Sequence, residues 1–228
     1  MTAYPVKVQD LLLNSPQFAE LGKKDMARLA AATSRVRAPA GTVLFRRGEP
    51  CAGVYVIVYG QAKLAVHGAD GAEKILEILG PGQSFGEPFM FLDEPHLSFA
   101  ETLADSLLLL VGKAAVLQTI AGNARFAQAM LASMAQRLQR VFCDIEAYTL
   151  KSGSQRVVEY LLREVPGDAT QSLDVRLPAA KSVVASRLSI TREHFSRVLH
   201  ELTHAGLIGV SGRVIHIGDP ARLRAWVG

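Results

Sequence analysis

The spacing of apolar residues changes twice along the chain, and each spacing predicts a different kind of element. Residues 6–32 have apolar positions close to helical spacing, among them Phe18, Leu21, Met26 and Leu29, so short helices are expected there. From about residue 36 to residue 112, short runs rich in β-forming residues, such as VYVIVY at 54–59, alternate with recurring glycines. This texture predicts many short antiparallel strands that form a barrel or a sandwich.

The third pattern is a segment at residues 113–150 that has no proline and one early glycine, Gly122. An apolar seam advances in alternating steps of four and three, as in a heptad repeat, and consists of Ala127, Leu131, Met134, Leu138, Val141, Ile145 and Tyr148. Two interpretations are open: a helix buried against its own domain, or a coiled coil between two copies of the chain. A second apolar set, Phe126, Met130 and Phe142, is expected to pack on the β-rich part, and Cys143 is expected to be a small core residue.

After a break of small residues, KSGSQ at 151–155, the pattern predicts a compact helical unit with a β-hairpin. Helices are expected at 179–188 and 192–205, with Thr191 or Ser189 capping the second and Gly206 ending it. Two strands around Ser211 and Gly212 follow, which makes a winged helix-turn-helix. The predicted fold class is therefore α+β: a β-roll at 1–122, a dimerisation helix at 123–150 and a winged helix-turn-helix at 151–228.

The helix at 192–205 has two faces when its residues are placed at about 100° per residue. The apolar face contains Phe195, Val198, Leu199, Leu202 and Ala205. The opposite face contains Arg192, Glu193, Ser196, Arg197, His200 and His204. Arginine, glutamate and serine side chains read base edges and contact phosphates, so this face predicts binding to double-stranded DNA.

The string HELTH at 200–204 has the His-Glu-x-x-His pattern of zinc hydrolases, which is the alternative function. A catalytic zinc needs a third protein ligand. The extended motif would place it at residue 210, which is a valine, and only His216 and Asp219 remain as downstream candidates. The sequence therefore predicts no catalytic residues and no zinc site.

Charge and composition sharpen this picture. Residues 151–228 contain 11 Lys and Arg against 7 Asp and Glu, whereas residues 1–150 contain 14 of each, so an acidic partner is expected at the C-terminal part. No apolar run approaches the roughly 20 residues of a membrane span, and no signal peptide is recognisable, so a cytoplasmic protein without a membrane partner is expected. The two cysteines, Cys51 and Cys143, cannot form a disulfide framework.

The order of these parts resembles the CRP/FNR superfamily of bacterial transcription regulators over essentially the full length. The stretches that carry the resemblance are GEPCAGVYVIVYGQAKL, GPGQSFGE and SITREHFSRVLHELTHAGLI. The resemblance implies a homodimer on a two-fold symmetric DNA site, RNA polymerase as a partner, and a signal sensed between the β-roll and the long helix. It leaves open whether the protein activates or represses.

The family's base-reading residues are found in this chain. Family members use Glu-x-x-Ser-Arg or Arg-Glu-x-x-Gly-Arg, and this chain has Arg192, Glu193, Ser196 and Arg197. Such a set implies a site similar to TTGAT-N4-ATCAA, because arginine pairs with guanine and glutamate accepts from cytosine. His200 and Arg213, in the wing, are further candidates for DNA contacts.

The sensor end departs from the nucleotide-binding members. Those carry a Gly-Glu pair and, ten residues after the Glu, an Arg-Ser pair that holds the cyclic phosphate and ribose. Gly86 and Glu87 are present here, but the second pair reads Leu97 and Ser98. Because leucine cannot pair with a phosphate, cyclic AMP is not expected as the effector. The expected effector pocket comprises Gly86, Glu87, Leu97, Ser98, Phe126 and Met130.

The stretches EKILEILGPGQSFGEPFMFLDEP and SQRVVEYLL are most similar to the dissimilatory-nitrate-respiration regulators. That subgroup implies haem as the sensor of nitric oxide. The sequence itself shows no haem ligand. His67 and His96 are candidates only as the histidines of the sensor part, and a solvated loop histidine is the alternative for each.

Overall fold

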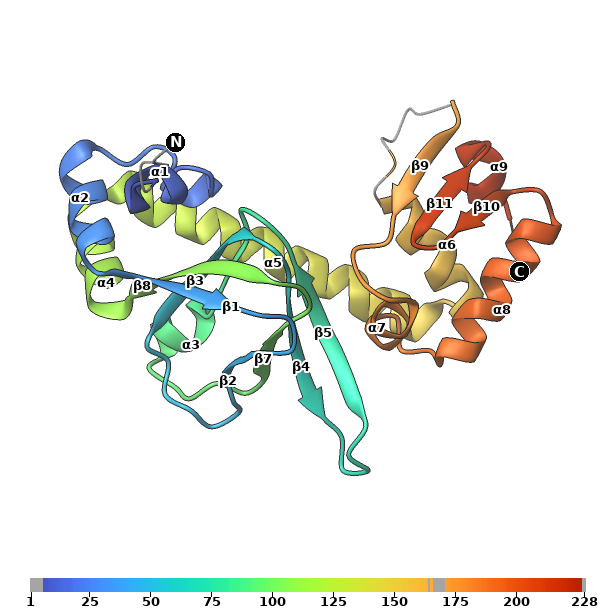
Figure 1. Ribbon diagram of the computed structural model, residues 1–228, viewed down its shortest axis with the longest axis horizontal. Helices are drawn as coiled ribbons and strands as arrows, with labels where there is room; N and C mark the ends of the chain where they lie inside the picture. The colour runs from blue at the N-terminus through green and yellow to red at the C-terminus, as the bar shows by residue number, and fades with distance from the viewer. Residues whose placement is uncertain (1–5, 164, 166–170, 227–228) are drawn as a thin grey trace. The chain divides into compact units, whose positions relative to one another are not determined.

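The computed structural model describes residues 6–163, 165 and 171–226. The chain divides into two compact units, which are described separately. The first consists of residues 1–67 and 76–139, and the second of residues 68–75 and 140–228. The α+β class is confirmed: a jelly-roll domain, a long helix and a helix-turn-helix occur in the predicted order (Figure 1).

The first unit is a β-roll with helices before and after its strands. One sheet has the strand order β1-β8-β3-β6 and the other β2-β7-β4-β5. The strands are β1 (Thr33–Ala38), β2 (Val43–Phe45), β3 (Gly53–Tyr59), β4 (Ala62–His67), β5 (Glu73–Leu79), β6 (Ser84–Phe85), β7 (Phe99–Thr102) and β8 (Ser106–Gly112). The helical segments are α1 (Val8–Leu12), η1 (Pro16–Phe18), α2 (Lys23–Ala31), α3 (Glu87–Leu92) and α4 (Lys113–Gly122).

Two apolar cores hold this unit together. One fills the roll, where Phe45, Ile57, Phe85 and Leu108 are at most 5% exposed. The other lies where the N-terminal helices meet β3 and β8, with Phe18 and Leu29 fully buried. The alternating apolar pattern of the strands supplies both cores, because successive side chains of a strand point to opposite faces of the sheet.

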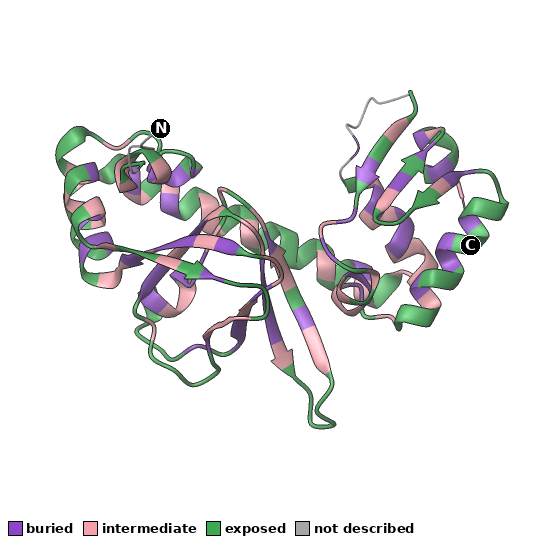
Figure 2. Ribbon diagram, viewed as in Figure 1, coloured by how far each residue is buried: buried purple, intermediate pink, exposed green. Residues whose placement is uncertain are grey.

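The long helix α5 (Ala124–Leu150) is mostly exposed along the chain described here (Figure 2). Phe126 and Met130 are each 2% exposed in the core with Phe18, as predicted. Phe142 is 62% exposed and Cys143 is also exposed, so the predictions of a packed Phe142 and a buried cysteine are wrong. The reason is that only the beginning of α5 contributes to the core beneath the N-terminal helices.

The second unit contains a helix-turn-helix and a three-stranded sheet with the order β10-β11-β9. Its elements are α6 (Gly153–Arg163), β9 (Leu173–Arg176), α7 (Lys181–Arg187), α8 (Arg192–His204), β10 (Ile208–Ser211), β11 (Val214–Ile217) and α9 (Pro220–Arg224). The wing hairpin β10–β11 lies where the sequence predicts it. The stretch LDVR adds a third strand because β9 pairs with β11.

Candidate nucleic-acid interface and sensor pocket

The second helix of the helix-turn-helix, α8, is fixed by its ends and by its apolar face. The hydroxyl of Thr191 accepts a hydrogen bond from the backbone N–H of His194 at 3.1 Å, which caps the first turn. Gly206, just past the end, has a φ of 67°, a conformation that glycine adopts without strain. Phe195, Val198, Leu199 and Leu202 are at most 2% exposed in the core of the unit. Ala205, which the helical wheel placed on the same face, is exposed.

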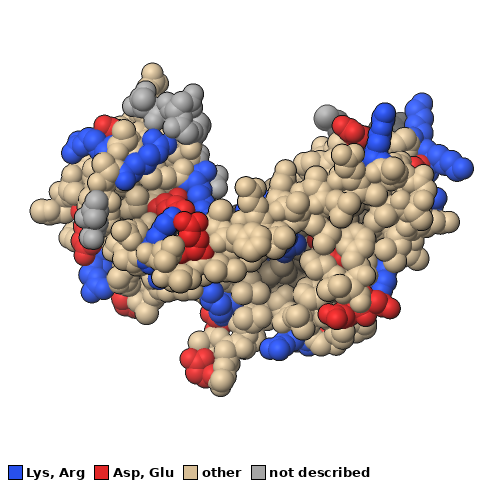
Figure 3. Space-filling model, turned by 180° about the vertical axis from the view of Figure 1, so that it is seen from behind, with Lys and Arg blue, Asp and Glu red and all other residues tan. Residues whose placement is uncertain are grey.

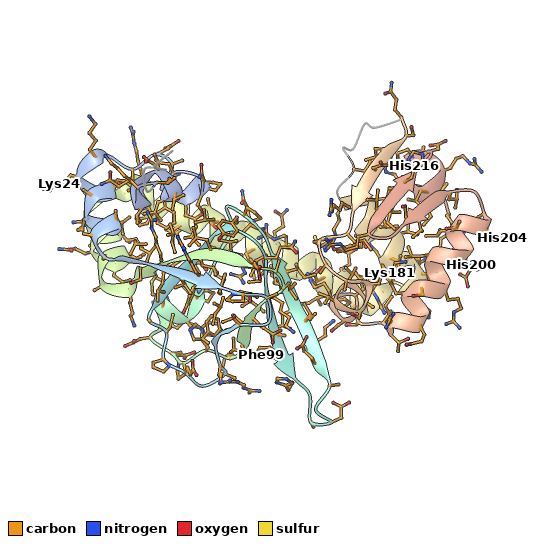
Figure 4. The ribbon with its side chains drawn as sticks, viewed as in Figure 1. Lys24, Phe99, Lys181, His200, His204 and His216 are labelled. Atoms are coloured by element: carbon orange, nitrogen blue, oxygen red, sulfur yellow. The ribbon has the colours of Figure 1, made fainter. Side chains whose placement is uncertain are left out.

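The polar face of α8 is exposed to solvent. Arg192, Glu193, Ser196 and Arg197 are all exposed and lie in the first two turns of the helix. His200 and His204 continue the same face toward its C-terminal end (Figure 4). A recognition helix of a helix-turn-helix contacts base edges with residues near its N-terminus, which is where the arginines and the glutamate lie.

One contact on this face was not foreseen from the sequence. A guanidinium nitrogen of Arg197 lies 2.9 Å from Nδ1 of His194. The His194 ring also lies close to the start of α6, because a Cβ added at Gly153 would be 2.7 Å from its Nε2. His194 therefore contacts the Arg197 guanidinium, and the start of α6 packs against the His194 ring. The sequence could have predicted this contact, because His194 and Arg197 are three residues apart on one helix and such residues are neighbours on its surface.

The wing presents one basic side chain of the predicted set. Arg213 is exposed next to Gly212, whose φ of 60° forms the hairpin turn. The Arg213 guanidinium lies 3.4 Å from the carbonyl oxygen of Pro178. The backbone carbonyl of Arg213 accepts a hydrogen bond from the backbone N–H of Leu177 at 2.8 Å. The backbone of the wing tip is thus tied to the segment before α7.

The HELTH string lacks the geometry of a zinc site. His200 and His204 are on α8, whereas His216 is on β11, where its Nδ1 lies 2.8 Å from Oδ1 of Asp174 (Figure 4). Asp219, the other candidate for a third ligand, caps α9 by accepting hydrogen bonds from two backbone N–H groups. Within the described part of the chain, no three His, Cys, Asp or Glu side chains gather as a metal site would require.

The expected effector site begins at the turn that leads from β6 into α3. Gly86 has a φ of 102°, and an added Cβ would lie 2.8 Å from the carbonyl oxygen of Gly53, so only glycine fits. The next residue, Glu87, is 5% exposed. Its Oε1 accepts a hydrogen bond from the hydroxyl of Ser84, and that hydroxyl accepts one from the amide of Gln17 at 2.6 Å. Burial raises the pKa of the Glu87 carboxyl above its usual range.

A guanidinium from the long helix faces the buried carboxyl group. Nη1 of Arg137, on α5, lies 3.5 Å from Oε2 of Glu87, and Nη2 pairs with the carboxylate of Glu77 on β5. The side chains of Arg137 and Glu77 are 22% and 19% exposed. No local spacing predicts this contact, because Arg137 is separated from both carboxylates by at least 50 residues of chain.

The other residues expected in the pocket do not share one environment. Leu97 is 59% exposed, whereas Ser98 beside it is 4% exposed. Phe126 and Met130 lie in the apolar core, and the Phe126 ring packs 5.6 Å from that of Phe18. The structure thus places Glu87 with Arg137 and Ser84, with Glu77 on the other side of Arg137, whereas Leu97 lies exposed and Phe126 and Met130 lie in the apolar core.

The two candidate haem ligands, His67 and His96, lie in different environments. His67 is exposed and stacks on Phe99 with ring centroids 4.7 Å apart. His96 is 2% exposed, stacked at 3.6 Å on Phe45 and covered at its edge by Phe89. Burial lowers the pKa of His96, and its Nδ1 has no hydrogen-bond partner in the described part of the chain. A neutral imidazole suits iron, and the Nδ1 of His96 is an unpartnered nitrogen of that kind within the described residues.

At the end of α5, a small polar cluster joins this helix to the helix-turn-helix within the second unit. Asp144 pairs with Arg187 on α7 and, at 3.1 Å, with Arg163 on α6. The hydroxyl of Tyr148 accepts a hydrogen bond from Arg187. The predicted break at 151–155 contains a capping box, because the hydroxyl of Ser152 accepts from the backbone N–H of Gln155 and the side chain of Gln155 accepts from that of Ser152.

Comparison with known proteins finds a family for each of two parts of the chain. Residues 35–123 match the cyclic nucleotide-binding domain family, and residues 155–226 match the Crp-like helix-turn-helix domain family. A CRP-like cAMP-activated global transcriptional regulator of Mycobacterium tuberculosis is 26% identical over 219 residues, which is 95% of this chain and 98% of that protein.

Solved structures match the fold of the chain. The structure of DNR from Pseudomonas aeruginosa is 34% identical, with a TM-score of 0.52, and the match covers 99% of this chain and all of that one. The structure of FixK2 from Bradyrhizobium japonicum is 22% identical, with a TM-score of 0.75 over 86% of this chain and 98% of that one. This chain belongs to the CRP/FNR family of DNA-binding transcription regulators. Regulators of this family bind DNA and act as dimers.

No helix in the described part of the chain is both long and apolar enough to cross a bilayer.

Proposed function

We propose that this protein is a homodimeric regulator that reads a palindrome similar to TTGAT-N4-ATCAA through α8. The observation that carries the proposal is the exposed set Arg192, Glu193, Ser196 and Arg197 on the first two turns of a capped helix. Two such helices, one from each copy, would enter successive major grooves. Arg213 of the wing and His200 are proposed as phosphate contacts.

The apolar seam of α5 supports the dimer. Leu131, Leu138 and Ile145 are 66%, 54% and 55% exposed along the chain. Large apolar side chains at heptad spacing are stable in water when a second helix covers them. Figure 3 draws the charged side chains in blue and red, and stretches of other residues lie between them on the face shown. A second copy with the same seam is the proposed occupant.

The proposed organisation follows from these roles: a sensor at 1–122, a dimerisation helix at 123–150 and a DNA-binding part at 151–228. Because the target is chromosomal DNA, we place the protein in the cytoplasm, with RNA polymerase as the partner that the family implies. Neither role needs a catalytic residue.

The test is a binding series on the palindrome and on variants with single base pairs replaced. Arg197→Ala should weaken binding to the palindrome by about 5- to 150-fold, the equivalent of a lost bidentate contact of about 1–3 kcal/mol. The loss should shrink when the G·C pair of the half-site is replaced. Arg222→Ala, an exposed arginine on α9, is the matched control and should change little. Equal losses on all sequences would make Arg197 a backbone contact.

The effector is the finer part of the proposal. The likeness to the dissimilatory-nitrate-respiration regulators supports haem and nitric oxide, with a cyclic nucleotide or another small molecule as the alternative. His67 and His96 are the ligand candidates for haem in this proposal, and His96 would have to leave its stack on Phe45 to bind iron. An absorption spectrum after haem reconstitution tests this directly. A Soret band of the wild type that is lost in the double variant His67→Ala, His96→Ala would show ligation by these histidines, and a band that persists in the double variant would show other ligands. No band in the wild type would exclude haem.

A further inference from the structure

We propose that His194 is a positioning residue for base recognition and that the start of α6 determines where its ring lies. The ring has two neighbours: the Arg197 guanidinium, one turn further along α8, and the first residue of α6, Gly153. All three residues belong to the same compact unit. The inference deepens the proposed function and rests on it, because Arg197 is the residue that the proposal assigns to a guanine.

The contact between the two side chains of α8 has only one possible direction. A guanidinium can only donate, so Nδ1 of His194, 2.9 Å from a terminal nitrogen of Arg197, must be the acceptor. A guanidinium has five N–H donors, so one can bond to His194 while two parallel N–H groups remain for O6 and N7 of a guanine. An arginine that is oriented before it meets DNA loses less side-chain entropy on binding. His194 therefore orients Arg197 for the base contact.

The other nitrogen of the ring lies close to the start of α6. Nε2 of His194 is inaccessible to water and has no hydrogen-bond partner in the described part of the chain. A Cβ added at Gly153 would lie 2.7 Å from this Nε2 and 3.1 Å from the Cγ2 methyl group of Ile190, in the turn before α8. Only a glycine at position 153 leaves room for the ring where it lies, so α6 limits the ring at the nitrogen that does not contact Arg197.

The start of α6 is itself joined to the turn of the helix-turn-helix. The Arg156 guanidinium donates to the backbone carbonyl of Lys151 at 3.1 Å and to that of Ser189 at 3.3 Å. This part of α6 follows α5 after a break of two residues, so a change in direction between the two helices would displace it. The imidazole ring would transmit such a displacement to Arg197, and the effect would fall on base discrimination.

The first experiment compares two substitutions of the ring in the full chain. In His194→Asn the side-chain oxygen takes approximately the place of Nδ1 and can still accept from Arg197, whereas His194→Leu has no acceptor. The readout is the ratio of the affinities for the palindrome and for a variant with the half-site G·C pair replaced. His194→Leu should reduce this ratio about two- to tenfold, the equivalent of one hydrogen bond, and His194→Asn should retain it within about twofold. Equal reductions in both variants would overturn the inference. So would an equal loss of affinity on all sequences, which is expected of a phosphate contact.

The second experiment tests the link to α6. Gly153→Ala places a methyl group against the ring and should reduce the affinity ratio about two- to tenfold, because the ring must move for the methyl group to fit. In the His194→Asn background the same change should have no effect, since no ring is left to displace. Gly218→Ala is the matched control and should change nothing, because a Cβ there would meet no atom within 4 Å. A loss of the same size in both backgrounds would overturn the inference, and so would no loss in either.

A third readout needs no DNA. Heteronuclear NMR spectra of the histidine rings in the free protein show which ring nitrogen carries the proton, and the signals lost in His194→Asn are those of His194. At a pH where the rings are neutral, this ring should carry its proton on Nε2. Arg197→Ala should shift the Nδ1 signal and Gly153→Ala the Nε2 signal, whereas Gly218→Ala should shift neither. A proton on Nδ1, or signals that do not respond to Arg197→Ala, would overturn the inference.

These experiments distinguish a failure of the inference from a failure of the proposed function. If the wild type binds the palindrome and its substituted variant equally, the proposed DNA site is wrong, while the spectra of the free protein still decide whether the ring contacts Arg197 and α6. If Arg197→Ala loses base discrimination but His194→Leu retains it, the proposed function stands and the inference fails.

Discussion

The recognition helix and the sensor pocket both carry short motifs that resemble those of the same family, but only the helix presents its motif in an accessible form. On α8 the motif residues Arg192, Glu193, Ser196 and Arg197 are exposed together. In the β-roll, Glu87 is buried against Arg137, and Leu97 stands where the family has an arginine. A motif within one helix is presented by local geometry alone, whereas the surroundings of a site assembled from distant segments depend on how those segments pack.

The first prediction concerns the dimer, on which both regions depend, and carries the largest expected effect. Leu138→Asp places a charge on the seam and should weaken self-association by about 30-fold to several thousand-fold, since removing an apolar side chain from a buried site costs about 2–5 kcal/mol. Analytical ultracentrifugation measures the change, and binding to the palindrome should be lost with it. Gln139→Asp introduces the same charge at an exposed neighbour and should remain dimeric. A Leu138→Asp variant that still sediments as a dimer would exclude this seam.

The second prediction distinguishes base recognition from phosphate binding within the proposed DNA-binding surface. Arg213→Ala in the wing should weaken binding about five- to tenfold on all sequences alike, because a phosphate contact carries no base information. The slope of log affinity against log salt should fall in magnitude by about 1. Titrations at two salt concentrations on the palindrome and on a scrambled site measure both quantities. A loss confined to the palindrome would make Arg213 a base-reading residue.

The third prediction tests whether base recognition by Arg197 depends on its contact with His194. His194→Leu removes the acceptor 2.9 Å from the Arg197 guanidinium and should reduce base discrimination about two- to tenfold, the equivalent of one hydrogen bond. In an Arg197→Ala background the same change should have no further effect. His204→Leu, an exposed histidine on the same helix, is the control. Independent losses in the double variant would remove His194 from the reading of DNA.

The fourth prediction, with the smallest expected effect, concerns the pH dependence of the sensor pocket. Because the pKa of Glu87 is raised in the folded protein, the native state binds more protons than the unfolded state between the unfolded and the folded pKa. The contribution of Glu87 to stability is therefore present at low pH and is lost as the pH rises through the folded pKa. The free energy of unfolding of the wild type, minus that of Glu87→Gln, should decrease as the pH is raised above about 4.5. A difference that is flat or increases with pH would contradict the raised pKa.

The sequence alone determined the fold class, the two-faced helix α8, the wing and the apolar seam. These features depend on local periodicity: Phe195, Val198 and Leu202 recur at helical spacing, and the glycines mark the turns between strands. Capping by Thr191 and the helix end at Gly206 were predictable for the same reason, because each involves only a few adjacent residues.

Tertiary structure decided what the sequence could not. Arg137 meets Glu87 and Glu77 only because the β-roll brings β5 and α3 to the side of α5, and no spacing along the chain encodes that meeting. The same holds for His96, which sequence reading left as a solvated loop or a metal ligand and which packs between Phe45 and Phe89. Phe142 and Cys143 show the converse, since helical spacing predicts a shared face but not which part of a long helix the rest of the chain covers. Periodicity specifies which side chains point together, and only the packing of distant segments determines what they meet.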